Sequence, residues 1–337
     1  MKRVTIKDLA KLSGFSTNTV SRALNNRPEI RRETKEKILK IASELGYRPN
    51  RLAKGLRQKK SGIVGVIVTD IANPFFGAVV KSVEKTARDL GYGIVLQDTN
   101  EDFEQEQEAV QIMLAQQVDG LLITPVQTSR DTIRDLENDN LPFVLLARRF
   151  ADWETDYVIP NDTQGGFIAT EHLIECGHTR IAIANGPPYV SSTKERFAGY
   201  EKALKKHGIE VNEAWVRTGA VTVEGGYRAA CALLKTKPRP SAIVAYSDFV
   251  AFGVLRAVRE VHLKVPDDIA VVGFDDIELS SCLPFPLTTV WSPKQDLGKE
   301  AMLALHRRIS DSDMEEKQQR ELEMRLIIRQ TTDNRLS

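Results

Sequence analysis

The chain has 337 residues, of which 42% are hydrophobic and 28% charged, and its formal net charge is +1. These proportions are typical of a globular protein, and the length exceeds what one compact domain usually holds. No apolar run is long enough to span a membrane and no secretory signal follows Met1, so we expect a cytoplasmic protein with no membrane partner. Three widely spaced cysteines form neither a disulfide framework nor a metal motif, and we expect no metal and no cofactor.

Charge is divided unevenly along the chain. Residues 1–60 hold 17 Lys and Arg against 5 Asp and Glu, a net charge of +12, and the remaining residues carry a net charge of −11. A basic segment attached to an acidic body indicates that the basic part meets a polyanion.

Three short helices are predicted in the first 49 residues. Thr5 and Asp8 match a capping box at the start of the first helix, and Gly14 can end that helix in a left-handed turn. Ser16 can cap a second helix through its hydroxyl. A third is expected from about residue 32 to residue 45. Two short helices joined by a tight turn are typical of the helix-turn-helix unit, which places its second helix in the major groove of DNA.

The second predicted helix carries side chains suited to reading base edges. Asn18 can pair with adenine and Arg22 with guanine, and Thr17 can offer a methyl group or a hydroxyl. Basic side chains nearby would contact phosphates. We therefore expect the headpiece to contact DNA through Thr5, Ser16, Thr17, Asn18, Ser21, Arg22, Asn25 and Arg31.

Two segments, "TIKDLAKLSGFSTNTVSRALN" and "ETKEKILKIASELGYRPNRLAKGLR", resemble the headpiece of the LacI/GalR family of bacterial transcriptional regulators. The resemblance implies a repressor that binds double-stranded, pseudo-palindromic operator DNA as a homodimer. It also implies that residues 50–61 form a hinge helix, in which Leu56 wedges open a base step; the alternative for this segment is a flexible basic linker. The hinge contacts implied in the same way are Asn50, Ala53, Leu56 and Arg57. Arg31 departs from the family, which usually opens the third helix with Ser or a similar cap.

Residues 62–337 alternate apolar, β-branched strands with helices, which predicts parallel sheets. Helices are expected over about 75–90, 103–117, 163–175, 195–207, 224–234 and 250–261. The length predicts two lobes, and the body resembles periplasmic sugar-binding proteins. The expected fold is thus an all-α helix-turn-helix headpiece (1–49), a hinge (50–61) and a two-lobed α/β core (62–337). The N-lobe would hold about 62–160 and 291–318, and the C-lobe about 161–290 and 319–337.

A small sugar-like effector is expected between the lobes, because ligands of open α/β sheets bind beyond the carboxyl ends of strands. Strand ends supply Asp70, Asn73, Phe75, Phe76, Arg148 and Asn161. The resemblance adds Arg196 from "RFAGY", Asp248 from "YSD" and Asp275 from "GFDD", with Trp215 and Gln295 as weaker candidates. Phe75 and Phe76 either stack on a sugar ring or pack in the core. For Arg196 and Asp275 the alternative is a structural ion pair.

The stretch "VLLARRF" departs from the family, which often has an Asp-Arg pair at this strand end. Ala147 stands in the position of that Asp and is followed by Arg148 and Arg149. A cleft that loses a carboxylate beside arginines becomes more positive, so the hypothesis is an acidic sugar or a sugar phosphate as effector. The competing interpretation is two outward, solvated arginines.

The alternative functions are an enzyme or a solute receptor on the same α/β scaffold. The sequence contains no GxSxG, GxxxxGK[ST], HExxH or strand-following GxGxxG motif, and the basic headpiece favours a regulator, so no enzymatic activity is expected. The sequence leaves open whether the effector induces or co-represses, and whether a protein corepressor takes part.

Overall fold

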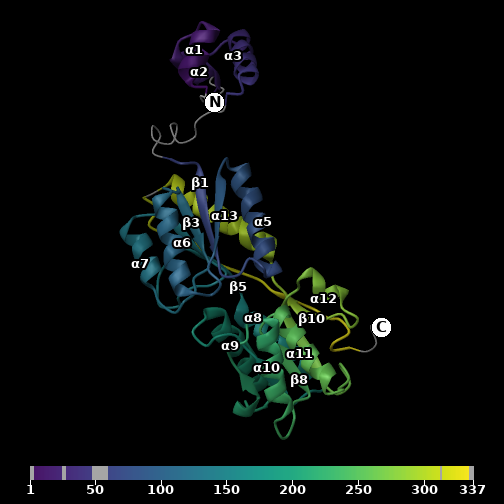
Figure 1. Ribbon diagram of the computed structural model, residues 1–337. Coiled ribbons are helices and arrows are strands. Elements are labelled where there is room, and N and C mark those ends of the chain that lie inside the picture. The colour runs from purple at the N-terminus through teal and green to yellow at the C-terminus, as the bar shows by residue number, and fades with distance from the viewer. Residues whose placement is uncertain (1–3, 25–27, 48–59, 312, 334–337) are drawn as a thin grey trace. The chain divides into compact units, whose positions relative to one another are not determined.

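The computed structural model describes residues 4–24, 28–47, 60–311 and 313–333. The chain divides into two compact units, Met1–Ser61 and Gly62–Ser337 (Figure 1). Asn25 and the predicted hinge contacts Asn50, Ala53, Leu56 and Arg57 lie outside the described residues.

The first unit contains α1 (Ile6–Ser13), α2 (Thr17–Leu24) and α3 (Arg32–Glu44). The predicted capping box is confirmed, since the Thr5 hydroxyl accepts from the Asp8 N–H and the Asp8 carboxylate accepts from the Thr5 N–H. Gly14 ends α1 at a φ of 75°, and the Ser16 hydroxyl accepts from the Thr19 N–H at 3.1 Å. Arg31 precedes α3 without a side-chain cap. The three helices enclose a small core of Leu9, Val20, Ala23, Ile38 and Ala42.

The second unit contains two six-stranded sheets. The first has the strand order β11-β5-β4-β3-β1-β2, and all of its strands run parallel. Its strands are β1 (Ile63–Val68), β2 (Gly93–Asp98), β3 (Gly120–Ile123), β4 (Phe143–Leu146), β5 (Tyr157–Pro160) and β11 (Gln319–Leu322). This sheet and its helices are called the first lobe.

The second sheet has the order β12-β10-β9-β8-β6-β7 and is parallel except for β12, which runs antiparallel to β10. Its strands are β6 (Ile181–Ala184), β7 (Val216–Arg217), β8 (Ala242–Ala245), β9 (Ala270–Asp275), β10 (Thr288–Trp291) and β12 (Arg325–Ile327). The predicted two-lobed α/β core with parallel sheets is therefore confirmed. The expected boundary at 319 is displaced, because β11 pairs with β5 of the first lobe before the chain crosses to β12.

Helices cover both faces of each sheet (Figure 1). The first lobe has α5 (Pro74–Asp89), α6 (Phe103–Ala115), α7 (Asp131–Asn138) and α13 (Lys294–Ser310). The second lobe has α8 (Asp162–Glu175), α9 (Ser191–Lys206), a 3-10 turn at Glu213–Trp215, α10 (Val223–Leu234), α11 (Asp248–Glu260) and α12 (Glu278–Cys282). Among the described residues, no helix is both long and apolar enough to cross a membrane.

The start of α9 differs from the sequence expectation. The helix begins at Ser191 rather than near Glu195, and Val190 precedes it without a side-chain cap. Ser and Thr are more typical of caps and turns than of helix interiors, so "SST" gave no helical signal. The additional turn matters because it brings Ser192 onto the helix that also carries Arg196.

Side-chain alternation explains why each sheet is buried on both faces. Along β1, Val64, Val66 and Val68 face the apolar layer under α5 and α13, whereas Ile67 faces the layer that includes residues of α6 and α7. Two further apolar clusters flank the second sheet in the same way. Because both faces of each sheet are buried and apolar, a binding site is expected at the polar residues that follow the ends of the strands.

Candidate functional site

The exposed face of α2 carries the side chains that the sequence singled out for base contacts. Val20 and Ala23 are buried, whereas Thr17, Asn18 and Arg22 are exposed and Ser21 is half-buried. The spacing follows the helical period, so one face packs on the headpiece core and the other meets solvent. Thr5 and Ser16 are occupied as helix caps, and Arg31 is exposed at the start of α3.

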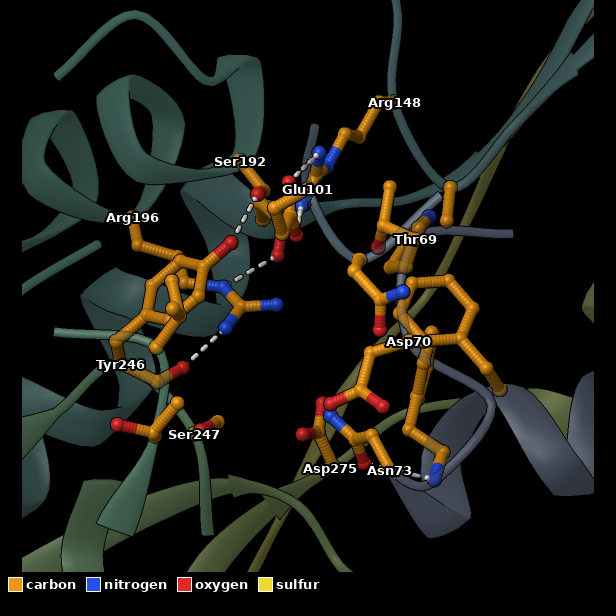
Figure 2. A pocket seen from close by; sticks show the side chains of 18 residues that line it. Thr69, Asp70, Asn73, Glu101, Arg148, Ser192, Arg196, Tyr246, Ser247 and Asp275 are labelled. Carbon is orange, nitrogen blue, oxygen red and sulfur yellow. Dashed lines mark hydrogen bonds and ion pairs between the residues drawn. The ribbon is translucent and has the colours of Figure 1, made fainter. Parts of the chain in front are cut away.

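A cleft of about 270 Å³ lies between the two lobes of the second unit (Figure 2). We call it the interlobe cleft. Of the predicted effector contacts, Asp70, Asn73, Phe75, Phe76, Arg148, Arg196 and Asp275 line it. Its other lining residues are Thr69, Asn100, Glu101, Ala147, Pro160, Asp162, Ser192, Val221, Thr222, Tyr246 and Ser247. Strand ends of both sheets thus meet at one cavity, as the strand-end rule predicts.

Arg196 is held rigidly at the second-lobe wall. Its Nε donates to Asp162 at 2.7 Å, another nitrogen donates to the Tyr246 carbonyl, and the guanidinium lies between the rings of Tyr246 and Phe274. Burial alone would lower the pKa of Arg196, but Asp162 beside it raises the pKa above its usual value. Figure 2 shows the remaining edge of the guanidinium facing the cavity. Arg196 is therefore held in place with donor groups directed at the cavity.

The close approach of α8 and α9 that positions Arg196 depends on a glycine. A Cβ added at Gly166 would lie 2.1 Å from the carbonyl oxygen of Arg196, far inside contact distance. Only glycine therefore allows the two helices to pack at this depth.

Asp275 ends β9 in a strained conformation. Its φ is 102°, and that of Asp276 is 52°, both in the left-handed region that non-glycine residues avoid. Lys294, itself buried, donates to the carbonyls of both residues and so holds this turn. Burial raises the pKa of Asp275, while Arg196 and Lys294 oppose that rise. Such strain is often found where a functional side chain is fixed in place.

Arg148 is paired with a carboxylate that the sequence reasoning missed. Its two terminal nitrogens lie 2.9 Å and 2.5 Å from the two carboxylate oxygens of Glu101, and one of them also donates to the Pro125 carbonyl. The Arg148 side chain is only 6% exposed. Arg149 points elsewhere and pairs with Glu195 and Glu321. The two arginines are therefore neither solvated nor uncompensated.

Phe75 and Phe76 pack in the core, and they also line the cleft. Each is 7% exposed and belongs to the apolar core of the first lobe, and each also lines the cleft. Their rings meet edge to face with centroids 5.0 Å apart. They open α5, whose N-cap is Asn73. Beside them, the Thr69 hydroxyl has no hydrogen-bond partner among the described residues.

Four predicted effector contacts do not line the cleft. Asn161 caps α8, and Trp215 packs in the core under α10 and α11 with its ring N–H donating to the Pro238 carbonyl. Asp248 is fully buried and accepts from Thr289 and Ser280 and from a backbone N–H. Gln295 is the second residue of α13. The turn at Asp275 is instead contacted by its neighbour Lys294, whose ammonium donates to the Asp275 carbonyl.

Some cleft residues could have been found from the sequence and others could not. Asn100 and Glu101 follow β2, so the strand-end rule applied to that strand would have named them. Ser192, Val221 and Thr222 have no such signal, because they enter from a helix and a loop whose course depends on tertiary packing. Figure 2 shows the labelled Ser192 at the edge of the cleft.

The cleft is acidic when its lining charges are counted. Four carboxylates line it against two guanidinium groups: Asp70, Glu101, Asp162 and Asp275 against Arg148 and Arg196. Both arginines already have a carboxylate partner. Within the part of the chain that the structure describes, no arginine forms an ion pair with the carboxylates of Asp70 and Asp275. Figure 2 shows these two side chains close to each other, across the cavity from Arg196.

Family models match almost the whole chain. Residues 5–50 match the model described as bacterial regulatory proteins, lacI family. Residues 61–331 match the model described as periplasmic binding proteins and sugar binding domain of LacI family.

Similar proteins of known role are repressors. The chain is 34% identical over 333 residues to the HTH-type transcriptional repressor PurR of Vibrio campbellii, covering 97% of this chain and 98% of that one. It is 34% identical over 313 residues to the ribose operon repressor of Escherichia coli K12, covering 93% and 95%.

Solved structures resemble the fold over nearly the full length. A lac repressor dimer bound to operator and the anti-inducer ONPF matches with a TM-score of 0.88 and 31% identity, covering 98% of this chain and 99% of that one. A complex of the transcriptional regulator CelR with cellobiose matches with a TM-score of 0.76 and 30% identity, covering 98% and 100%.

Proposed function

The chain belongs to the lacI family of bacterial regulatory proteins, and from that premise we propose that it represses carbohydrate-related genes under the control of a small, neutral, polyhydroxylated effector. The observation that carries this proposal is the interlobe cleft, whose paired arginines and remaining carboxylates suit hydroxyl groups better than anions.

DNA binding is assigned to the headpiece. The exposed face of α2 offers Thr17, Asn18 and Arg22 to base edges, while Arg31 would add a phosphate contact. Thr5 and Ser16 would act through the helix N-termini that they cap, and Ser21, Asn25 and the hinge residues complete the proposed set by family resemblance. Two headpieces of a homodimer would read the two halves of a pseudo-palindromic operator.

The effector contacts that we propose are the seven predicted residues that line the cleft, together with Glu101. Carboxylates of Asp70 and Asp275 would accept from sugar hydroxyls, Arg196 would donate, and Phe75 and Phe76 would cover an apolar ring face. An acidic sugar or sugar phosphate is disfavoured, because burying an anion beside two carboxylates without a free cation is costly. The hypothesis drawn from Ala147 thus gives way to a neutral ligand.

The size of the cleft favours a monosaccharide. Its volume of about 270 Å³ lies at or below the lower end of pockets for drug-sized ligands, which start near 300 Å³. Two relatives also have a sugar in their names, namely the ribose operon repressor and the CelR–cellobiose complex.

A purine is the second candidate, since several relatives are named PurR. A flat base needs apolar faces on both of its sides. Here Phe75 and Phe76 line the cleft from the first lobe. The second lobe lines it with the hydroxyl groups of Ser192, Thr222 and Ser247, and its aromatic residue there, Tyr246, has its ring against the guanidinium of Arg196. The hydroxyl-rich wall favours a sugar over a base.

Control would operate by population shift. Effector contacts come from both lobes, so a bound effector stabilises the arrangement in which the lobes enclose it. To convert the protein from mostly operator-competent to mostly incompetent, or the reverse, the effector must discriminate between the two states by roughly 5.5 kcal/mol.

A thermal-shift panel on the full chain tests the proposal. The panel contains D-ribose and other pentoses, neutral hexoses and cellobiose, with gluconate, ribose 5-phosphate and hypoxanthine as the competing classes. We expect a neutral sugar to raise the melting temperature of the core, because a ligand that binds only the folded state stabilises it by mass action.

Matched variants make the panel specific to the cleft. Asp275→Asn should lose the shift, whereas Asp89→Asn, an exposed aspartate at the end of α5, should keep it. Stabilisation by the anions alone, or by hypoxanthine alone, would contradict the neutral-sugar assignment.

A further inference from the structure

The N-terminal turn of α9 is bound to the first lobe by side chains that do not line the cleft. Gln127 lies in the loop between β3 and α7, and Ser191 opens α9. The Gln127 side chain accepts from the Ser191 N–H at 2.9 Å and donates to the Arg149 carbonyl at 2.7 Å. One amide group therefore bridges the lobes with both of its ends occupied.

Arg149 adds an ion pair to the same junction. Its backbone N–H donates to the Ser191 hydroxyl at 3.2 Å, and its Nε and Nη2 each lie 3.1 Å from one carboxylate oxygen of Glu195, one turn along α9. On the first-lobe side, the guanidinium is held by the Tyr157 hydroxyl at 3.1 Å and by Glu321 at 3.2 Å. The side chains of Arg149 and Glu195 are 26% and 18% exposed, so water screens the pair only in part.

The first-lobe half of this junction is itself fixed. Gln127 has a φ of 72°, and the N–H of its neighbour Val126 donates to the carboxylate of Glu106 at 2.6 Å. Glu106 is completely buried and also accepts from the Thr132 hydroxyl at 2.5 Å. A loop clamped in this way presents the Gln127 amide in a defined direction.

The residues that α9 carries into the cleft connect the junction to ligand binding. Ser192 and Arg196 face the cavity from the same helix turn that Gln127 and Arg149 hold. We propose that Gln127 and Arg149 are positioning residues for the interlobe cleft: with Ser191 and Glu195 they form an interlobe latch that holds α9 against the first lobe and sets how far the lobes open.

The strength of these contacts suits a latch that can be released. Opening returns the Gln127 amide and the Glu195 carboxylate to water, which compensates for most of the lost bonding, so each contact contributes a modest net free energy. Arg149 keeps its first-lobe partners when the lobes part. The latch therefore shifts the equilibrium toward the arrangement with the lobes held together, but it does not prevent the lobes from opening. This role depends neither on the identity of the effector nor on DNA binding.

Double electron–electron resonance on the ligand-free, full-length chain measures the opening directly. Spin labels are placed at Asn138→Cys on α7 and Lys205→Cys on α9, both exposed, in a background in which Cys176, Cys231 and Cys282 are serine. We expect Gln127→Ala and Glu195→Ala to shift the distribution to longer distances, raising the ratio of open to closed molecules roughly threefold to tenfold.

Two further variants separate positioning from general destabilisation. Glu201→Ala removes an exposed glutamate of the same helix and should leave the distribution as in the parent protein. Arg149→Lys should give an intermediate distribution, because an ammonium can meet Glu195 but lacks the fork that also engages Tyr157 and Glu321. The proposal is overturned if Gln127→Ala and Glu195→Ala leave the distances unchanged, or if Glu201→Ala changes them equally. Should one of the two latch variants not fold, the other decides.

Discussion

The headpiece and the interlobe cleft use charged and polar side chains in opposite ways. On α2, Asn18 and Arg22 are exposed. In the cleft, Arg148 and Arg196 are buried and each is bound to a carboxylate. In the proposed sites, the DNA-contacting side chains of the headpiece are thus hydrated before DNA binds, whereas the arginines of the cleft are already fixed by carboxylates.

The difference follows from the size of the partner. A DNA duplex supplies many phosphates, and the affinity gained from them can order exposed side chains at the moment of binding. The monosaccharide that we propose as effector would offer only a handful of hydroxyls, so little binding free energy would be available for arranging the site. Arg196 is accordingly held in advance by Asp162 and by two aromatic rings.

The largest effect is expected from removing a pre-arranged charge. Arg196→Ala leaves Asp162 buried without its partner, which should lower the free energy of unfolding of the core by about 3–5 kcal/mol. All three tryptophans of the chain, Trp153, Trp215 and Trp291, lie in the second unit, so tryptophan fluorescence during urea unfolding follows the core alone. Arg256→Ala removes exposed pairs with Glu224 and Glu260, which water screens, so it should lower the free energy of unfolding far less than Arg196→Ala does. If Arg196→Ala and Arg256→Ala lowered the free energy of unfolding equally, the buried pair would not differ from the exposed one.

The buried Asp248 should make the stability of the core depend on pH. Burial raises the pKa of Asp248 to about 7, from an ordinary value near 3.8. The folded state therefore binds the proton more tightly than the unfolded state, and the stabilisation present at low pH is lost as the pH rises through about 7. The rise of about 3 pKa units, at about 1.4 kcal/mol per unit, corresponds to a loss on the order of 4 kcal/mol.

Asp248→Asn tests that dependence, because the amide does not titrate. The difference in unfolding free energy between parent and variant should change steadily between pH 4 and 7 and level off above it. A difference that stays constant over this range would show that Asp248 titrates normally.

The exposed residues of α2 should affect DNA binding without affecting folding. Asn18→Ala should weaken binding to the specific operator by about 1–3 kcal/mol, while binding to unrelated DNA and the unfolding free energy stay unchanged. The operator is first selected from random duplexes with the full chain, and fluorescence anisotropy then measures both affinities. Asn138→Ala, which changes an exposed asparagine on α7 of the second unit, serves as the matched control. A uniform loss on both DNAs would assign Asn18 to phosphate contact.

The smallest effect concerns the scaffold of the reading helix. Thr5→Ala removes the hydroxyl of the capping box at α1 and should destabilise that helix by about 1 kcal/mol. Amide hydrogen exchange of residues in α1 should become roughly fivefold faster, with Thr128→Ala as a control in the core. Unchanged exchange in α1 would mean that tertiary packing, and not the cap, holds its first turn.

Local features of this chain could be predicted from its sequence because their causes are local. The Thr5–Asp8 capping box and the turn at Gly14 each depend on residues a few positions apart. The alternation of strands and helices likewise gave the two parallel sheets, and seven of the proposed effector contacts followed from strand ends and family motifs.

The remaining features depend on partners far away in the sequence. Nothing near "ARR" in the sequence reveals that Arg148 pairs with Glu101 or that Arg149 pairs with Glu195. The sequence therefore predicted a positive cleft, whereas in the structure both arginines are paired with carboxylates. Asp248 sits beside a strand end as predicted but turns inward to Ser280 and Thr289. The strand-end rule identifies positions; the direction of a side chain there is decided by tertiary packing.

The central claim is that a small molecule in the core governs DNA binding by the headpiece. The direct test is the affinity of the full-length chain for its selected operator, measured by anisotropy with and without a saturating amount of the neutral sugar found in the thermal-shift panel. The account predicts that the sugar changes operator affinity at least about fivefold, and that operator DNA changes the affinity for the sugar by the same factor. An operator affinity that is identical at zero and saturating sugar would contradict it.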